Sequence, residues 1–132
     1  MTTNLENRIE NKYKSKGETK IAKLLNQYGI NFIYEPDLYL KDGNKRYIWH
    51  PDFYLPEHQT IIEYFGIQGN DNYDNGTKKK KKLYHKNHYH LIPVYPKTLT
   101  KNYQTYILKN LHNYQKNKLT DLKRKIGSGS YK

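Results

Sequence analysis

The sequence predicts an α/β domain: a small mixed β-sheet of about four strands flanked by helices, in the order helix, three strands, helix, strand, helix. Two observations lead to this prediction. Apolar residues recur at helical spacing in 16–28 and again near the C-terminus, whereas 31–40, 46–55 and 60–65 are rich in β-branched and aromatic residues. A basic segment of helical character then precedes a fourth strand at 91–95. A helical crossover of this kind lets the fourth strand pair in parallel with its neighbour.

The first helix has signals at both of its ends. Ser15 is a predicted N-cap, and Glu18 three residues later has the spacing of a capping box. Gly29 can supply the left-handed residue that ends the helix. Between these signals, the residues at helical spacing are Ile21, Leu24, Leu25 and Tyr28.

Three strands are expected next. Pro36 forces a break or an edge position in 31–40, and 41–44 (KDGN) reads as a hairpin turn. Strand alternation in 46–55 would place one set of side chains on each face of the sheet. The first set is Ile48, His50, Asp52 and Tyr54, and the second is Tyr47, Trp49, Phe53 and Leu55. The short strand at 60–65 is mostly apolar, which predicts burial on both faces.

The second half of the chain begins with a polar loop at 66–76 and a basic helix at 77–90, which carries five consecutive lysines. Thr98 or Thr100 can cap a last helix. We therefore expect a polar lead-in at 1–14, one domain at 15–117 and a basic tail at 118–132. The GSGS stretch at 127–130 resembles a flexible linker.

Composition narrows the functional classes. The 132 residues suit one domain, and 24 Lys+Arg against 12 Asp+Glu give a net charge of +12, which predicts attraction to a polyanion such as nucleic acid. The absence of Cys excludes disulfides, thiolate metal sites and a Cys nucleophile. No apolar run is long enough for a membrane span, and the first residues lack the apolar stretch of a signal peptide. We expect an intracellular protein with no membrane partner.

Four acids lie on segments that a small sheet would bring together: Glu18, Glu35, Asp52 and Glu63. Glu63 lies within the most apolar segment, where an unpaired carboxylate costs several kcal/mol. In so basic a chain, converging acids suggest a bound cation. Oxygen ligands without thiolate select Mg²⁺ or Mn²⁺.

The stretch HPDFYL-PEHQT-IIEYFG resembles the core of the PD-(D/E)XK nuclease superfamily, which has the restriction-endonuclease-like fold. Pro51-Asp52 matches the "PD", Glu63 matches the "(D/E)", and SKGETKIAKLL matches the first helix with Glu18 as its acid. The similarity spans roughly 15–111. It implies an Mg²⁺-dependent DNA endonuclease, with Mn²⁺ able to substitute and no organic cofactor. A role in repair, recombination or a mobile element follows only by analogy.

The resemblance also implies roles for individual residues. Asp52, Glu63 and the carbonyl of Tyr64 would bind the metal, and Glu18 would bind it directly or through water. The family's lysine should lie two residues after Glu63, where this chain has Phe65. We expect a lysine from 79–82 to replace it, and we name Lys80 and Lys82 as catalytic candidates. The remaining candidates for DNA contact are Lys78, Lys79, Lys81, Lys86 and His50, with Glu35 and Gln68 as accessory residues.

Other interpretations stay open. The domain could be a non-catalytic nucleic-acid-binding module that retains the fold, which the missing lysine supports. A basic RNA-binding protein would explain the charge but not Glu63. The lysine run could equally be a solvated helix face, and the acids could be structural. His85 and His88 have the spacing of a zinc pair but no evident third ligand. If the domain is a nuclease, we expect a homodimer, because this short chain has room for one active site.

Overall fold

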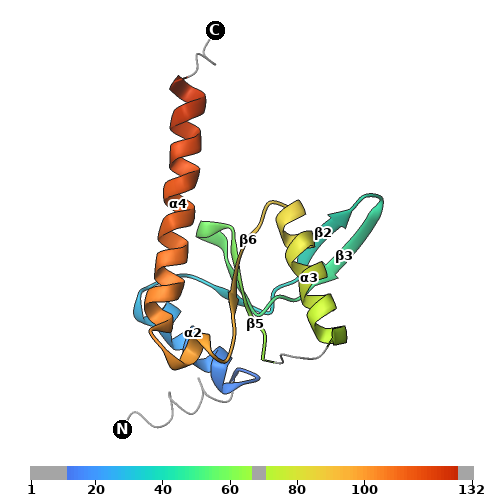
Figure 1. Cartoon of the computed structure of the whole chain (residues 1–132), viewed down its shortest axis with the longest axis vertical. Coiled ribbons are helices and arrows are strands. Elements are labelled where there is room, and N and C mark those ends of the chain that lie inside the picture. The colour runs from blue at the N-terminus through green and yellow to red at the C-terminus, as the bar shows by residue number, and fades with distance from the viewer. Residues whose placement is uncertain (1–11, 67–70, 128–132) are drawn as a thin grey trace.

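The computed structural model describes residues 12–66 and 71–127. Its elements follow one another along the chain from a helix near the N-terminus to a long helix at the other end (Figure 1). They are α2 (Lys16–Gln27), β1 (Ile33–Tyr34), β2 (Leu38–Asp42), β3 (Lys45–Trp49), β4 (Phe53–Leu55), β5 (Thr60–Tyr64), α3 (Asp71–Lys86), β6 (His90–Val94) and α4 (Tyr103–Gly127), with 3-10 turns at Pro56–His58 and Thr98–Thr100.

The main sheet has four strands in the order β1-β4-β5-β6. β4 pairs antiparallel with both β1 and β5, and β5 pairs parallel with β6, as expected for a strand that returns through the crossover helix α3. β2 and β3 form a separate two-stranded hairpin. The predicted fold class, a small mixed sheet flanked by helices, is confirmed.

Two apolar clusters cover the two faces of the sheet. Side chains of α2 and α4, including Leu25 and Ile107, pack with Phe53 and Ile62 on one face. On the other face, α3 and the inner side of the β2–β3 hairpin pack against β5. β5 is consequently buried along Thr60–Glu63, as its apolar composition predicted.

Both long segments predicted to be strands are divided into two strands. The break that Pro36 predicted in 31–40 is confirmed, whereas the prediction of one continuous strand over 46–55 was wrong. The segment 31–40 breaks between β1 and β2, where Glu35 has a left-handed φ of 48° and Pro36 follows. The segment 46–55 breaks between β3 and β4 at 50–52, which contains Pro51. Proline cannot donate a ladder hydrogen bond, so strand pairing stops at each break. At the first break the chain passes from the main sheet to the hairpin, and at the second it returns to the main sheet. The two expected faces of 46–55 therefore do not exist, and the three strands do not form a meander.

The helices of the second half also differ from the predictions. α3 begins at Asp71, within the expected loop, and ends at Lys86 rather than His90. Thr98 and Thr100 lie in a 3-10 turn, and α4 begins only at Tyr103. The segment expected as a basic tail from 118 continues α4 to Gly127. In the part of the chain that the structure describes, we find no helix with the length and apolar character of a membrane span.

The first turn of α2 approaches the sheet unusually closely. Ser15 caps this helix as predicted, its hydroxyl accepting from the Glu18 N–H at 3.1 Å. A Cβ atom at Gly17 would come within 2.6 Å of the Tyr64 ring and 3.0 Å of Leu99. Glycine thus allows α2 to pack on the end of β5 and brings Glu18 beside the sheet.

We predict that Gly17→Ala destabilises the fold by about 1–3 kcal/mol, because the added methyl group must displace the Tyr64 ring from its packed position. Chemical denaturation of the variant measures this loss. Gly76→Ala in α3 is the matched control, since nothing lies within 4 Å of a Cβ there. It should gain about 0.5–1 kcal/mol from helix propensity. Equal stabilities of the two variants would contradict the close approach.

Candidate active site

Asp52 and Glu63 hold each other in place through reciprocal hydrogen bonds. The main-chain N–H of Asp52 donates to Glu63 Oε1 at 3.0 Å, and the N–H of Tyr64 donates to Asp52 Oδ2 at 2.7 Å. Asp52 immediately precedes β4, and Glu63 lies near the end of the neighbouring strand β5. The antiparallel ladder between these strands fixes both carboxylates relative to each other.

Glu63 is a buried carboxylate, only 4% exposed. Its partners besides the Asp52 N–H come from one face of α3: Lys80 Nζ lies 3.3 Å from Oε2, and the Tyr84 hydroxyl donates to Oε1 at 3.4 Å. Lys80 and Tyr84 are four residues apart, the spacing that aligns side chains on a helix. Burial and the charge of Glu63 raise the pKa of Tyr84, so its hydroxyl keeps its proton as a donor.

Burial, and after it the negative charge of Glu63, raise the pKa of Asp52 to about 7. The Tyr64 N–H and the positive charge of Lys80 act in the opposite direction but do not cancel these effects. Loss of the proton from Asp52 is therefore less favourable in the folded protein than in an exposed carboxyl group. A bound cation would make that loss more favourable.

Glu18 reaches the same region from α2 and is 6% exposed. The Ser15 hydroxyl donates to its Oε2 at 2.9 Å and the Tyr34 hydroxyl to its Oε1 at 2.7 Å. Its negative charge contributes to the raised pKa of Asp52, which places the two groups in electrostatic range. In the predicted capping box the Glu18 side chain would bond a main-chain N–H; here it bonds the cap's hydroxyl.

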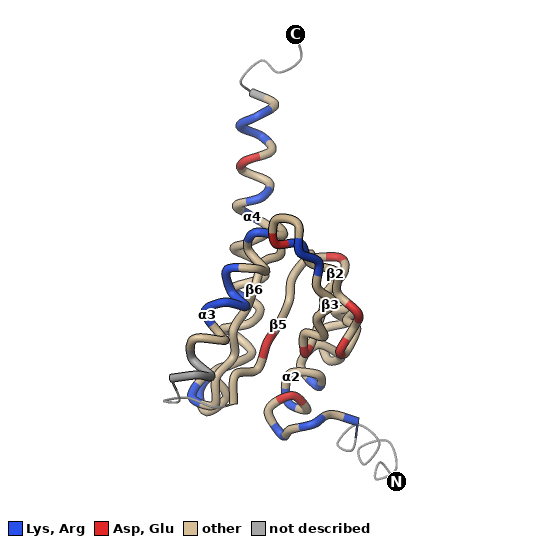
Figure 2. Tube along the Cα trace, turned by 90° about the vertical axis from the view of Figure 1, so that its right-hand side faces the viewer, with Lys and Arg blue, Asp and Glu red and all other residues tan. Residues whose placement is uncertain are grey.

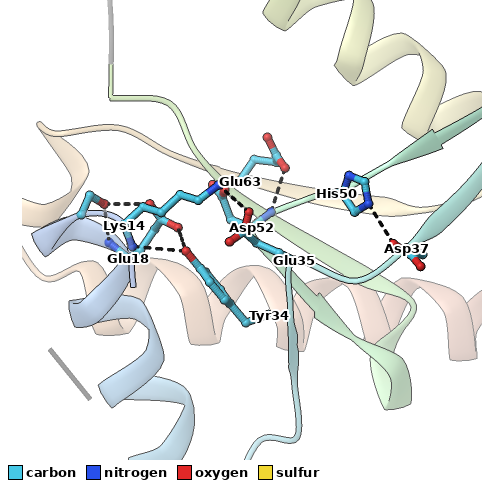
Figure 3. Close-up of polar contacts among 9 residues, drawn as sticks. Lys14, Glu18, Tyr34, Glu35, Asp37, His50, Asp52 and Glu63 are labelled. Carbon is cyan, nitrogen blue, oxygen red and sulfur yellow. Dashed lines mark hydrogen bonds and ion pairs between the residues drawn. The ribbon is translucent and has the colours of Figure 1, made fainter. Parts of the chain in front are cut away.

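A second lysine, which the sequence did not single out, reaches the acids from the segment that precedes α2, whereas Lys80 belongs to α3. Lys14 Nζ lies 2.7 Å from Glu35 Oε2 (Figure 3). This hydrogen bond and the charges of Glu35, Glu18 and Asp52 raise the pKa of Lys14. Glu35, named as an accessory residue of the site, thus pairs with a surface lysine.

A hollow of about 380 Å³, which we call the acid cleft, adjoins these acids: Glu35 lines it, and Lys80 and Tyr84, which also line it, both bond Glu63. It is lined by Lys14, Glu35, Ile48, Trp49, His50, Lys80 and Tyr84. His50 lies at its rim with its ring nitrogen Nε2 2.8 Å from Asp37 Oδ1. A larger hollow of about 600 Å³ lies beside β6, lined by His85, His88 and His90 among others, and contains no carboxylate. The acid cleft is selected because its lining residues Lys80 and Tyr84 bond the buried carboxylate of Glu63, and not because of its size.

The other lysines of α3 lie away from the acids. Lys81 Nζ bonds the Tyr95 hydroxyl at 2.8 Å, and Lys86 Nζ pairs with Asp42 at 2.8 Å. Lys78, Lys79 and Lys82 are exposed. Figure 2 shows the Lys and Arg positions of α3 in blue. Of the lysines proposed to replace the one missing at Phe65, only Lys80 contacts a site acid among the described residues. Gln68 lies outside the described residues.

The sequence reasoning did not find four of the residues that hold this site together: Lys14, Ser15 in its bond to the Glu18 carboxylate, Tyr34 and Tyr84. Tyr84 could have been found, because it lies one helical turn after Lys80 on the same face of α3. Lys14 gave no signal, because it lies in a polar segment with no periodicity. Tyr34 was expected in a strand, but a strand pattern alone does not say which partner its hydroxyl meets.

The donor chemistry suits a hard divalent cation. Mg²⁺ in proteins is commonly held by one or two carboxylates while it keeps several waters. Asp52 and Glu63 supply two oxygen donors, and the Tyr64 carbonyl lies on the same strand end. Among residues 12–66 and 71–127, no group of three or more His, Asp or Glu side chains is close enough to hold a metal ion directly. The donor set therefore fits a two-carboxylate site in which Glu18 acts at longer range.

The fold resembles that of one solved nuclease domain. The catalytic domain of the homing endonuclease I-Bth0305I superposes on 76% of this chain and 98% of its own length, with a TM-score of 0.55 and 18% identity. This similarity shows a shared fold. No protein-family model matches the sequence, and a search of curated proteins gives no match.

We predict that Asp52→Asn stabilises the metal-free protein at pH 8. A carboxyl group whose pKa is higher in the folded chain binds its proton more tightly there, so folding loses stability as pH rises from about 4 to about 7. Asparagine can still accept from the Tyr64 N–H but carries no charge. We expect a gain of about 1–3 kcal/mol at pH 8 that shrinks towards pH 5.

Thermal or urea unfolding of both proteins across this pH range, in buffer with a chelator, measures the effect. Asp121→Asn is the control, because Asp121 is an exposed acid on α4. If the free energies of unfolding of Asp52→Asn and of the wild type changed with pH in the same way, the pKa of Asp52 would not be raised in the folded protein.

Proposed function

We propose that this chain is a metal-dependent DNA endonuclease of the PD-(D/E)XK type, in which Asp52 and Glu63 bind Mg²⁺ and Mn²⁺ can replace it. The observation that carries the proposal is the interlocked pair of Asp52 and Glu63, with the Lys80 amine 3.3 Å from Glu63. The homing endonuclease domain of the same fold supports it. So does the net charge of +12, which suits a polyanionic substrate.

The bound metal would supply a water of lowered pKa and neutralise charge on the scissile phosphate. The chain's own groups do the positioning. Lys80, held by Glu63, can turn to a phosphate oxygen and stabilise the charge that develops there. Tyr84 holds the Glu63 carboxylate, while Ser15 and Tyr34 hold Glu18 toward the site. The expected products carry a 5′-phosphate and a 3′-hydroxyl.

Lys14 is a second cation for the same phosphate. Its amine reaches the acids from the segment before α2, whereas Lys80 comes from α3, so the two amines approach from different elements. Lys14 is 73% exposed at its side chain, and its partner Glu35 is 28% exposed. A substrate phosphate could therefore exchange with Glu35 at little cost, because exposed ion pairs are weak.

We predict that Asp52→Asn and Glu63→Gln abolish cleavage, and that Lys80→Ala lowers its rate by about 10²-fold, the usual cost of removing one transition-state donor. Lys109→Ala, at an exposed lysine of α4, is the control and should change the rate less than about twofold. Nicking of supercoiled plasmid with Mg²⁺, with Mn²⁺ or with a chelator measures all of these.

A non-catalytic DNA-binding module would give a different result. Wild type and Asp52→Asn would then retard DNA equally, and neither would nick it with either metal. Phe65, which occupies the position of the family's lysine, is only 2% exposed and packs on Tyr95, so it offers no substitute donor. The effect of Lys80→Ala on plasmid nicking therefore distinguishes the enzyme from the binding module.

A homodimer is the assembly we propose for cutting both strands, because each chain supplies a single acid cleft. Sedimentation velocity with a cognate-length duplex should show two chains per cleaved duplex. One chain per duplex, with nicking of one strand, would instead identify a monomeric nickase.

A further inference from the structure

The β2–β3 hairpin extends from the body of the domain and presents an outer face that the proposed chemistry does not use (Figure 1). Tyr39 is 72% exposed and Ile48 is 53% exposed, and the two are direct cross-strand partners. The next partners along the same face are Lys41 and Arg46. We call these four residues the ribbon face. The inner face carries Leu38 and Leu40, which are buried.

The hairpin is fixed to α3 and has little freedom to move. Asn87 receives the Lys41 N–H at 2.9 Å and donates to the Lys41 carbonyl at 3.0 Å. Asp42 pairs with Lys86 at 2.8 Å, and the Trp49 ring meets the Tyr84 ring edge-on at 5.6 Å. The ribbon face is therefore held at a defined position relative to Tyr84, which also bonds Glu63.

The ribbon face also adjoins the acid cleft. Ile48 belongs to the ribbon face and lines the cleft as well. Asp52 follows Ile48 by four residues, so their Cα atoms lie at most about 14 Å apart. Along a duplex axis, this reach corresponds to about four base pairs. A nucleic acid whose phosphate lies in the cleft would pass along the ribbon face.

The charge of the face selects its occupant. Lys41 and Arg46 carry positive charge, and the nearest acid along the same face, Asp37, is paired with His50 at 2.8 Å. A second copy of this chain would bring the same positive charges together, which disfavours self-association through the face. A two-stranded ribbon with its side chains fits the major groove of B-form DNA, which is about 12 Å wide. Arginine, tyrosine and isoleucine suit phosphates, base edges and thymine methyl groups respectively.

We propose that the ribbon face docks in the major groove of duplex DNA beside the scissile phosphate and thereby fixes where the strand is cut. Arg46 and Lys41 contact phosphates, while Tyr39 and Ile48 pack against the edges of base pairs. This inference rests on the proposed nuclease function for its biological meaning. Binding can be measured without cleavage, so the two proposals can fail separately.

The test measures binding of fluorescent 30-base-pair DNA by anisotropy in metal-free buffer, for Tyr39→Ala and Arg46→Ala. Tyr28→Ala and Lys97→Ala are matched controls, because both residues are exposed and lie away from the hairpin. All four substitutions are at the surface, and unfolding curves verify that each variant is folded. Duplex RNA and single-stranded DNA of the same sequence are measured in parallel.

We expect each ribbon variant to weaken duplex DNA binding by about 5–10-fold and the controls to change it less than twofold. Arg46→Ala should also lower the slope of log affinity against log salt by about one, whereas Tyr39→Ala should leave it unchanged. Methyl green, which occupies the major groove, should compete with the protein, and netropsin in the minor groove should not.

Ribbon variants that bind duplex DNA like the wild type would overturn the proposal. Equal or stronger ribbon-dependent binding to duplex RNA would also overturn it, because the deep, narrow major groove of A-form RNA excludes a ribbon. Ribbon-dependent self-association without DNA would identify a second copy as the occupant instead. Ribbon-dependent binding without plasmid nicking would sink the nuclease proposal alone, and nicking with ribbon-independent binding would sink only this inference.

Discussion

The arrangement of the site depends on the pairing between the start of β4 and the end of β5. That pairing lets each acid accept a hydrogen bond from the main chain at or beside the other, so a movement of either carboxylate would break one of these two bonds. The same pairing keeps two like charges close in a partly buried place. The protein accepts this unfavourable arrangement because the hydrophobic cores on both faces of β5 stabilise the strand.

The acids lie inside a chain with a large excess of positive charge, and the two features are complementary. Surface cations attract a polyanion from a distance, whereas the buried acids supply the carboxylate oxygens that hard divalent cations prefer as ligands. Lys14 and Lys80 each pair with an acid of the site, and each side chain is still partly exposed to a ligand arriving from solvent. A phosphate arriving at the acid cleft would meet ammonium groups from two different elements.

Much of the fold could be predicted from local pattern, but the site could be predicted only in part. Periodicity located α2, the strand character of β5 and β6, and the crossover between them. The sequence also placed four acids on segments that were expected to meet. Pro51 made the strand prediction for 46–55 wrong, because the alternation of that segment continues through Pro51 although the backbone changes sheets there. Choosing Lys80 among five consecutive lysines required the rotation of α3 about its axis, which a lysine run with no apolar periodicity does not reveal.

The sequence by itself determined the class of the domain, its charge and the acids available for chemistry, because composition and spacing are properties of the chain alone. Tertiary structure alone decided which groups meet: Lys14 with Glu35, Tyr34 with Glu18, and Tyr39 with Ile48 on an open hairpin face. The physical reason is the distance along the chain over which each interaction acts. Side-chain periodicity reports which face of an element is buried, whereas a hydrogen bond between residues far apart in sequence depends on how separate elements pack, and packing is settled by the whole core at once.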